Sequence, residues 1–463
     1  MTDIAQRLLE IVPAVQVLAD DAITDDYTHD ESLTCVPERP AVVVLPVTTE
    51  DVVAVLRLAD KLRLPVTARG SGTGLSGGCV PRRGGILLSF ERMNRILEID
   101  TENQVAVVQP GVTLAQLDEA TAAYGLVYPV FPGESSASLG GNVATNAGGM
   151  RAVKYGVTRH QVLGLEAVLA NGEVIRTGGK FVKATSGYDL TQLIVGSEGT
   201  LAVVTEIVLK LYPRPAHRAT VLVPFRSITE IAAAVPRIIA SGADPLVLEY
   251  IDAMSMAAAT ANVGLDLGIP GEVKDAALAY LVVVLENGRP DRLDEDVSAL
   301  GGLLEELGAI DVYVLPPVPA VQLLDAREKA FWVAKQFGAN DIVDVVVPRA
   351  SIPGYLATVS RLAQEHSTTV LGAGHAGDGN VHLSIFQSDA EKRDTVMRAI
   401  FEAGLALGGA ISAEHGIGTA KKHYFLTLED PAKIRLMRGI KLAFDPHGIL
   451  NPGTLFTPTG DPL

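Results

Sequence analysis

The chain has 463 residues, of which 48% are hydrophobic and 20% charged, and its formal net charge is −16. This length allows two or three domains, and the acidic charge argues against a nucleic-acid partner because such proteins usually carry a basic patch. Two cysteines are too few for a disulfide framework, and the longest apolar run, residues 276–285, is about half a membrane span. We therefore expect a cytoplasmic protein without a transmembrane segment.

The first predicted elements are a helix and short strands. Apolar residues at helical spacing predict a helix over 50–62, and residues 64–68 predict a strand. Residues 86–90 predict another strand, so the glycine-rich segment 66–81 joins strand to strand. A second helix is predicted over 113–125.

The segment Gly72–Gly77 fits the G-x-G-x-x-G pattern of nicotinamide-binding proteins, but that pattern must open a helix. Pro81 and the pair Gly84-Gly85 forbid a helix here. Instead, the backbone N–H groups of residues 70–74 can turn towards one anion, and Arg69 adds a fixed positive charge. The segment is predicted to bind a pyrophosphate, and a plain glycine-rich hairpin loop is the alternative.

Two later stretches are also rich in glycine. Residues 131–156 contain too few bulky apolar side chains to form core, which indicates a loop against which a flat group lies. Residues 196–213 show strand alternation after Gly199. A domain boundary is predicted at residues 212–218, where two prolines interrupt the pattern.

After this boundary the chain repeats a strand-helix-strand pattern twice. Such a pattern predicts a ferredoxin-like antiparallel sheet with helices on one side, and an α+β fold for the whole chain. The predicted strands are 219–225, 245–252, 277–287 and 310–316, and the predicted helices are 227–242 and 291–308.

Residues 368–386 predict a β-hairpin that turns at residues 377–380. In this register His375 faces His382, and Ser384 lies on the same face. Directly opposed residues have Cβ atoms about 5 Å apart, so the two imidazoles can hold one divalent ion.

A third ligand is available in residues 412–418, which place Glu414 and His415 before a glycine turn. Two histidines and a carboxylate leave open positions for substrate oxygens, so His375, His382 and Glu414 are the predicted metal ligands. The alternative is that the histidines are satisfied cross-strand neighbours and that Glu414 is a helix-end charge.

From about residue 40 to residue 453, these motifs resemble the FAD-linked D-2-hydroxy acid dehydrogenases. That family includes the glycolate oxidase flavin subunit, D-lactate dehydrogenase and D-2-hydroxyglutarate dehydrogenase, within the vanillyl-alcohol oxidase/p-cresol methylhydroxylase superfamily. The resemblance implies a two-part FAD-binding domain over residues 1–214 and a ferredoxin-like substrate and metal cap domain over 215–424. A C-terminal segment, 425–463, would return to the FAD domain.

The resemblance also implies how FAD is held. The first glycine loop would wrap the pyrophosphate, and the two later stretches would line the rest of FAD and its isoalloxazine ring. Covalently flavinylated relatives often carry a histidine in or just after the first loop, where this chain has Thr73 and Leu75, so we expect non-covalent FAD. The expected FAD-binding residues are Arg69, Gly70, Ser71, Gly72, Thr73, Gly74, Pro132, Gly133, Gly141, Asn142, Thr145, Gly148, Gly149, Gly156, Glu198, Gly199 and Asn451.

In the family, residues matching His375, His382 and Glu414 bind zinc or a similar ion. The residue matching His415 is the general base, and the one matching Arg327 binds the substrate carboxylate, although a solvated helical arginine is the alternative for Arg327. A 2-hydroxy acid can chelate a cation, which lowers the hydroxyl pKa, and a histidine with an ordinary pKa of about 6.5 can take the proton. The C2 hydrogen would then leave as hydride to flavin N5.

The sequence therefore predicts an FAD- and metal-dependent dehydrogenase that oxidises a D-2-hydroxy acid to the 2-oxo acid. A metal-dependent hydrolase without flavin and a non-catalytic flavin subunit of an electron-transfer complex are the alternatives. Relatives that act on dicarboxylates have a lysine where Ile342 stands. Lys335 could replace that lysine only if its helix places the Lys335 side chain at the same site. This favours D-lactate, glycolate or a longer 2-hydroxy alkanoate.

The expected partners are a small 2-hydroxy acid and an electron acceptor that the sequence does not identify. Cys35 and Cys79 alone cannot ligate an iron–sulfur cluster, so electrons must leave to another molecule. That acceptor could hold the protein peripherally at a membrane, and a homodimer is the default expectation.

Overall fold

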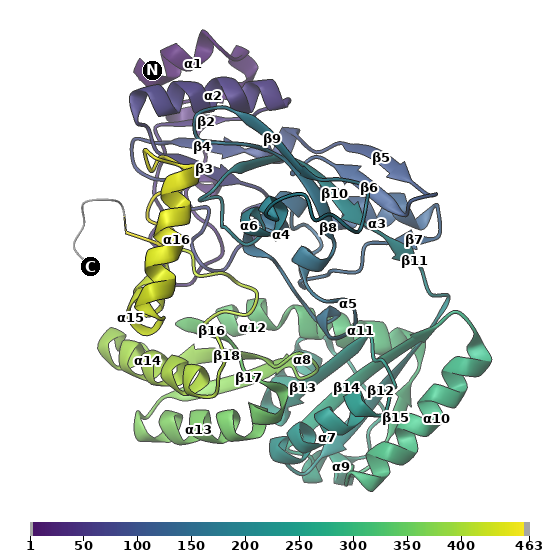
Figure 1. Ribbon diagram of the computed structural model, residues 1–463. Coiled ribbons are helices and arrows are strands. Elements are labelled where there is room, and N and C mark those ends of the chain that lie inside the picture. Colours follow the sequence, from purple (N-terminus) through teal and green to yellow (C-terminus); the bar gives the residue numbers. More distant parts are fainter. Residues whose placement is uncertain (1–2, 458–463) are drawn as a thin grey trace.

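The computed structural model describes residues 3–457, which form two halves and a C-terminal segment (Figure 1). The first half contains a four-stranded and a five-stranded sheet, and the second contains one seven-stranded sheet. In Figure 1 the first half lies above the second, and the C-terminal helix α16 (Pro431–Phe444) runs beside the first half.

The four-stranded sheet has the order β1-β2-β4-β3, in which β2, β4 and β3 are parallel. One face of this sheet packs on α1 and α2, and the other packs on Ile23 and Tyr27. The predicted helix over 50–62 is confirmed as α2 (Thr49–Leu62), and Thr48 caps it by accepting a hydrogen bond from Asp51 N. The other elements of this part are α1 (Asp3–Leu9), β1 (Val17–Leu18), β2 (Val42–Val44), β3 (Val66–Arg69) and β4 (Ile86–Ser89).

The five-stranded sheet is antiparallel with the order β5-β6-β10-β8-β9. The predicted helix over 113–125 is confirmed as α3 (Leu114–Ala122), with Thr113 at its N-cap. The strands are β5 (Ile96–Asp100), β6 (Val105–Val108), β8 (Val162–Val168), β9 (Val174–Gly178) and β10 (Val203–Lys210). Around them lie α4 (Leu139–Thr145), α5 (Ala152–Tyr155), α6 (Leu190–Ile194) and the pair β7 (Leu126–Val127) and β11 (Tyr212–Pro213).

The seven-stranded sheet consists of two ferredoxin-like units joined edge to edge. In the first unit β12, β13, β14 and β15 have the order β15-β12-β14-β13, and in the second β16, β17 and β18 have the order β17-β18-β16. The units meet where β13 pairs with β17 in antiparallel register. The bounds are β12 (His217–Phe225), β13 (Val247–Asp252), β14 (Ala279–Asn287), β15 (Tyr313–Leu315), β16 (Asp341–Val346), β17 (Thr369–His375) and β18 (Asn380–Phe386).

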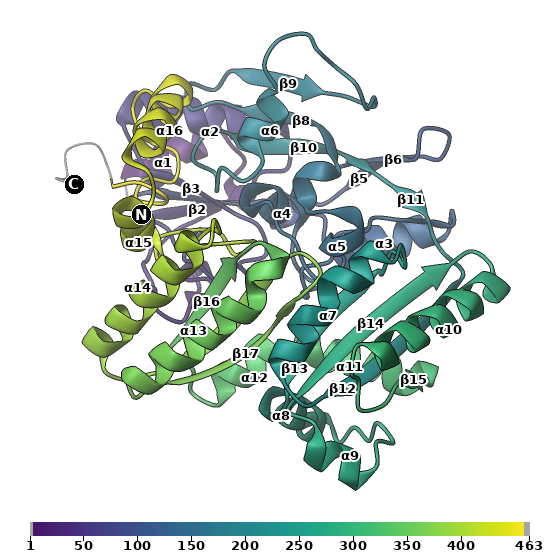
Figure 2. The same cartoon turned by 60° about the horizontal axis from the view of Figure 1, so that its bottom comes forward.

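Helices cover both faces of this sheet, whereas the sequence pattern predicted one. The far face packs on α7 (Ile228–Ala240), α10 (Pro290–Glu306), α13 (Ile352–Glu365) and α14 (Ala390–Ala406). The other face packs on α8 (Ala253–Val263), α9 (Gly271–Ala276) and α11 (Pro317–Glu328), and α12 (Ala330–Gln336) lies against α8. Figures 1 and 2 show α11 and α12 on the side that faces the first half. Within this second layer, α11 and α12 therefore lie between the sheet and the first half, whereas α9 lies at the end of the sheet away from the first half.

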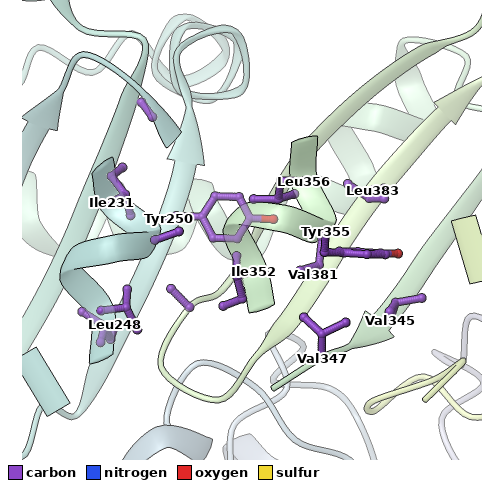
Figure 3. Packing of buried hydrophobic residues seen from close by; sticks show 14 of the residues in the cluster. Ile231, Leu248, Tyr250, Val345, Val347, Ile352, Tyr355, Leu356, Val381 and Leu383 are labelled. Carbon is purple, nitrogen blue, oxygen red and sulfur yellow. The ribbon is translucent and has the colours of Figure 1, made fainter. Parts of the chain in front are cut away.

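The main core of the second half crosses the junction between the two units. Tyr250 of β13 is 1% exposed and Tyr355 of α13 is fully buried. In Figure 3, Tyr250 points towards Ile352 and Leu356 of α13, so a strand of the first unit packs on a helix of the second. This shared core makes the two units one structural body.

The C-terminal segment connects the halves. After α15 (Lys422–Leu428) and α16, Leu450 pairs with Val66 of β3 in the four-stranded sheet. Lys441 of α16 pairs with the fully buried Asp445, and its Nζ also donates to the carbonyl of Thr200. Over residues 3–457, no helix has both the length and the apolar character needed to cross a membrane.

Candidate active site

The first glycine loop follows β3 and packs closely on the start of α4. A Cβ on Gly70 would overlap Ser138 Oγ, which caps α4, and Gly72 has a φ of +76°, a conformation that favours glycine. Arg69 does not point freely into solvent, because its Nη1 donates to the carbonyl of His29 at 2.6 Å. The loop is thus a fixed backbone turn, as expected of a segment that binds an anion closely.

A cavity of about 190 Å³ extends from this loop. It brings together, from three separate stretches, most of the residues expected to bind FAD: Gly70, Ser71, Gly72, Thr73, Gly74, Pro132, Gly141, Asn142, Thr145, Glu198 and Gly199. The remaining expected residues lie elsewhere. Gly133 and Gly149 line a second, larger cavity, while a Cβ on Gly156 would overlap the ring of His160. Gly148 packs against Glu414, where a Cβ would lie 2.7 Å from Oε2.

The chemistry of this cavity suits FAD. Two residues that line the cavity have a buried polar atom without a hydrogen-bond partner among the described residues. These atoms are Asn142 Nδ2 and Asp30 Oδ2. Buried polar atoms are normally satisfied, so these atoms suit a polar ligand. A Cβ on Gly74 would lie 3.5 Å from Asp30 Oδ2, which is an ordinary van der Waals contact.

Glu198 and Asn451 join separate segments of the chain beside the cavity. The carboxylate of Glu198 accepts hydrogen bonds from Ile417 N at 2.9 Å and Gly418 N at 2.7 Å. The Asn451 amide donates to the carbonyls of Gly78 and Glu198. The Glu198 contacts fasten the loop after His415 to the first half of the chain, and the Asn451 contacts fasten the C-terminal segment to it.

Three imidazoles converge on one oxygen of Glu414. Oε1 lies 3.4 Å from His375 Nε2, 3.3 Å from His382 Nε2 and 3.9 Å from His415 Nε2. Atoms bound tetrahedrally to one zinc ion at about 2.0–2.1 Å are roughly 3.3 Å apart. The spacing between Glu414 and the two hairpin histidines therefore fits a shared divalent ion.

The hairpin register differs from the predicted one by two residues. His382 pairs with Ala373, and the turn is formed by residues 376–379. His375 and His382 still share a face and their ring centroids lie 4.8 Å apart, as diagonal neighbours. The reason is that β16 pairs with β18 as far as Asn380, which draws this residue out of the turn and into the strand.

Each hairpin histidine has a carboxylate beside its other ring nitrogen. His375 Nδ1 lies 2.6 Å from Glu249 Oε1, and His382 Nδ1 lies 3.7 Å from Asp344 Oδ1. Metal-binding histidines commonly have such carboxylate partners, which fix the ring with Nε2 free for the ion. Asp344, His382, Glu414 and His415 also offer atoms that all lie within 4.8 Å of one another. We assign Asp344 a positioning role and not that of a metal ligand. Its Oδ2 already accepts hydrogen bonds from Ser412, Ala413, Glu414 and His415.

Arg327 reaches the same cluster from α11. Its Nη2 lies 2.9 Å from Glu249 Oε2, so Glu249 links Arg327 to His375. Arg327 is not the solvated surface residue of the alternative interpretation: its side chain is 11% exposed and lines the larger cavity. Its Nε is buried and has no hydrogen-bond partner within residues 3–457, which leaves a donor for an anion.

Comparison with known proteins identifies the family of this chain. A family model described as "FAD binding domain" matches residues 40–178, and one described as "FAD linked oxidases, C-terminal domain" matches residues 214–455. The chain belongs to the FAD-linked oxidase family. An uncharacterized FAD-linked oxidoreductase of Mycobacterium tuberculosis is 58% identical over 99% of this chain and 100% of that protein. A D-lactate dehydrogenase of Anaerostipes hadrus is 37% identical over 98% of this chain and 97% of that protein.

The fold of this FAD-linked oxidase also matches solved structures. A crystal structure of p-cresol methylhydroxylase with substrate bound has a TM-score of 0.82 and 18% identity, covering 99% of this chain and 97% of that one. The predicted α+β architecture of the vanillyl-alcohol oxidase/p-cresol methylhydroxylase type is therefore confirmed.

In this oxidase, burial and neighbouring charges shift the pKa values of the residues in the cluster. Burial alone would raise the pKa of Glu414, but the charges of His375 and His382 hold it well below the ordinary value. Burial alone would lower the pKa of His375, but Glu249 and Glu414 hold it well above the ordinary value. Burial lowers the pKa of His382. Protons and a metal ion therefore compete for the same ring nitrogens.

Sequence reasoning missed Glu249 and Asp344. Each lies in the middle of a mostly apolar, buried strand whose other carboxylate, Asp252 or Asp341, is at the strand's end; Glu249 is fully buried and Asp344 is 5% exposed. A buried charge needs a partner, so an acidic residue in such a strand was a usable signal.

Proposed function

We propose that this FAD-linked oxidase is a dehydrogenase that oxidises a D-2-hydroxy acid to the 2-oxo acid. The observation that carries the proposal is that Glu414 and His415 line both the cavity beside the glycine loop and the larger cavity beside Arg327. The cavity beside the glycine loop suits FAD, and the larger cavity beside Arg327 suits a substrate. His375, His382 and Glu414 would hold a divalent ion in the same wall.

The residues divide the chemistry between them. Arg327 would bind the substrate carboxylate, and His415 Nε2 would accept the proton of the C2 hydroxyl. FAD, held non-covalently, supplies the acceptor for the hydride from C2. A divalent ion such as zinc would supply positive charge beside the substrate oxygens. The relative of Anaerostipes hadrus is named a D-lactate dehydrogenase, which supports a hydroxy acid as substrate.

The test is an anaerobic visible spectrum of the FAD-loaded protein during addition of D-lactate. We expect the flavin band to bleach as the substrate reduces the flavin. A colourless protein that does not take up FAD would instead support the metal-dependent hydrolase. A flavin band that no 2-hydroxy acid bleaches, even with zinc or manganese added, would support a non-catalytic flavin subunit.

The variant His415→Ala tests the assignment of the base. Because the proposed metal ligands His375, His382 and Glu414 and the glycine loop are unchanged, we expect FAD and metal contents to stay near wild type while the rate of flavin reduction falls by about 10²–10⁴-fold. Stopped-flow absorbance measures this rate. Bleaching at the wild-type rate would show that another group takes the proton.

A further inference from the structure

The cavity beside His415 continues well beyond the polar cluster. Its volume is about 510 Å³, within the range of about 300–1,000 Å³ of pockets that enclose drug-sized ligands. It begins at His375, which is 6% exposed, and reaches the surface at Met254 and Phe337, which are 65% and 68% exposed. A substrate whose tail is a single methyl group would leave most of this space unfilled.

The walls beyond the cluster are mostly apolar, with Ser255, Glu328, Thr369 and Ser384 as the polar exceptions. They are formed by α8, α11, α12 and the ends of β16, β17 and β18. The apolar side chains include Met254, Ala258, Leu323, Val333, Ala334, Phe337, Ile342, Leu371 and Phe386. Burial of a methylene group in such surroundings is favourable by about 0.8 kcal/mol, which is roughly fourfold in affinity.

Beyond the polar cluster, the cavity offers no lysine or arginine from residues 3–457 to pair with a second acidic group. Among the described residues that line it, Arg327 is the only lysine or arginine, and it is paired with Glu249. Lys335 of α12 does not line it, because its Nζ lies 2.7 Å from Glu31 Oε2 and 5.3 Å from the ring centre of Trp332. Glu328 lines the cavity and adds a carboxylate. A carboxylate in the substrate's tail would lose its hydration there without gaining a partner.

We propose that the enzyme prefers D-2-hydroxy acids with an apolar tail longer than the methyl group of D-lactate, and that it discriminates against dicarboxylates. This inference rests on the proposed function. The carboxylate and hydroxyl would lie at Arg327 and His415, and the tail would extend along the apolar walls towards Met254 and Phe337.

The first test compares kcat/KM for D-lactate, D-2-hydroxybutyrate, D-2-hydroxyhexanoate and D-2-hydroxyglutarate with an artificial electron acceptor. We expect kcat/KM to rise about three- to fourfold for each added methylene and to be lowest for D-2-hydroxyglutarate. Equal or greater activity on D-lactate or D-2-hydroxyglutarate would overturn this inference while leaving the proposed function intact. Failure of every acid to reduce the flavin would overturn the proposed function itself.

Two tryptophan substitutions in α8 test where the tail of the substrate lies. Ala258 lines the cavity, whereas Ala257 beside it is exposed and does not. We expect Ala258→Trp to lower the ratio of kcat/KM for D-2-hydroxyhexanoate over D-lactate at least tenfold, and Ala257→Trp to leave this ratio unchanged. Since both substrates are measured on one preparation, any loss of folded protein cancels from the ratio. An unchanged ratio in Ala258→Trp would overturn the placement.

Discussion

Glu249 shows how one buried side chain can serve two functions of a site. It is fully buried, and its two oxygens contact His375 and Arg327. Its charge therefore orients one candidate metal ligand and one candidate substrate-binding residue together. Such a buried carboxylate is tolerated because both of its oxygens have cationic or hydrogen-bonding partners.

We predict that Glu249→Gln weakens metal binding by about 10- to 100-fold, as is typical when the partner of a metal-binding histidine is changed. It should also raise KM, because Arg327 loses its ion pair. Metal content after dialysis and steady-state kinetics measure the two effects. The control is Glu286→Gln, since Glu286 is a carboxylate on β14, 1% exposed, that contacts Tyr155. Equal metal content in both variants would contradict the prediction.

Glu198 gives the stability of the apoprotein a defined pH dependence. Burial raises its pKa to about 7, whereas its ordinary value is 4.5. Between these values the unfolded chain has released a proton that the folded protein still holds, so stability must fall as pH rises through this window. We expect urea denaturation to show a steeper fall between about pH 5 and pH 7 in the wild type than in Glu198→Gln. Identical pH profiles would show that Glu198 does not titrate in this range.

At the scale of elements, strand β16 fixes the backbone of the loop that carries Glu414 and His415. Asp344 Oδ2 accepts from Ser412 Oγ at 2.8 Å and from the backbone N–H groups of residues 413–415 at 2.8–3.0 Å. Its Oδ1 accepts from Asn380 Nδ2 at 2.7 Å, at the start of β18. One carboxylate thus aligns the loop that carries Glu414 and His415 with the hairpin that carries the other two histidines.

We predict that Asp344→Asn slows flavin reduction by about 10²-fold or more, because a small displacement of reacting groups has an effect of this size. Asp341→Asn on the same strand is the matched comparison. It breaks the buried pair with Lys421, so we expect a loss of about 3–5 kcal/mol in stability with flavin reduction preserved. Stopped-flow and denaturation experiments separate the two effects. The assignment fails if Asp344→Asn reduces its flavin at the wild-type rate.

At the scale of the whole molecule, the site exists only where the two halves meet. The glycine loop and Glu198 come from the first half, whereas His375, His382 and Glu414 come from the second. Glu198 binds the backbone of Ile417 and Gly418 across this boundary. A ligand in the cavity between them contacts both halves and therefore stabilises their association.

We predict that FAD at about 100 times its Kd stabilises the apoprotein by about 2.7 kcal/mol, since it binds the folded state and not the unfolded chain. Thermal or urea denaturation with and without added FAD measures this difference. NADH is the control, because the glycine loop leads into a strand and lacks the helix of a nicotinamide site. Equal stabilisation by NADH would contradict the assignment of the cavity.

The sequence alone determined the local features whose signals are short in range. The helices at 50–62 and 113–125 follow from apolar spacing and caps, and the loop after β3 follows from its glycines and prolines. The shared face of His375 and His382 follows from strand alternation alone, because a two-residue shift in register preserves the face.

Only the tertiary structure decided what depends on contacts between distant segments. The register of the hairpin was set by its pairing with β16, and the union of the two units by pairing of β13 with β17, which lie over a hundred residues apart. The places of Glu249 and Asp344 depend on the same contacts. Such pairings leave no local pattern in the sequence, because their free energy comes from burial and hydrogen bonding between strands that meet only in the folded chain.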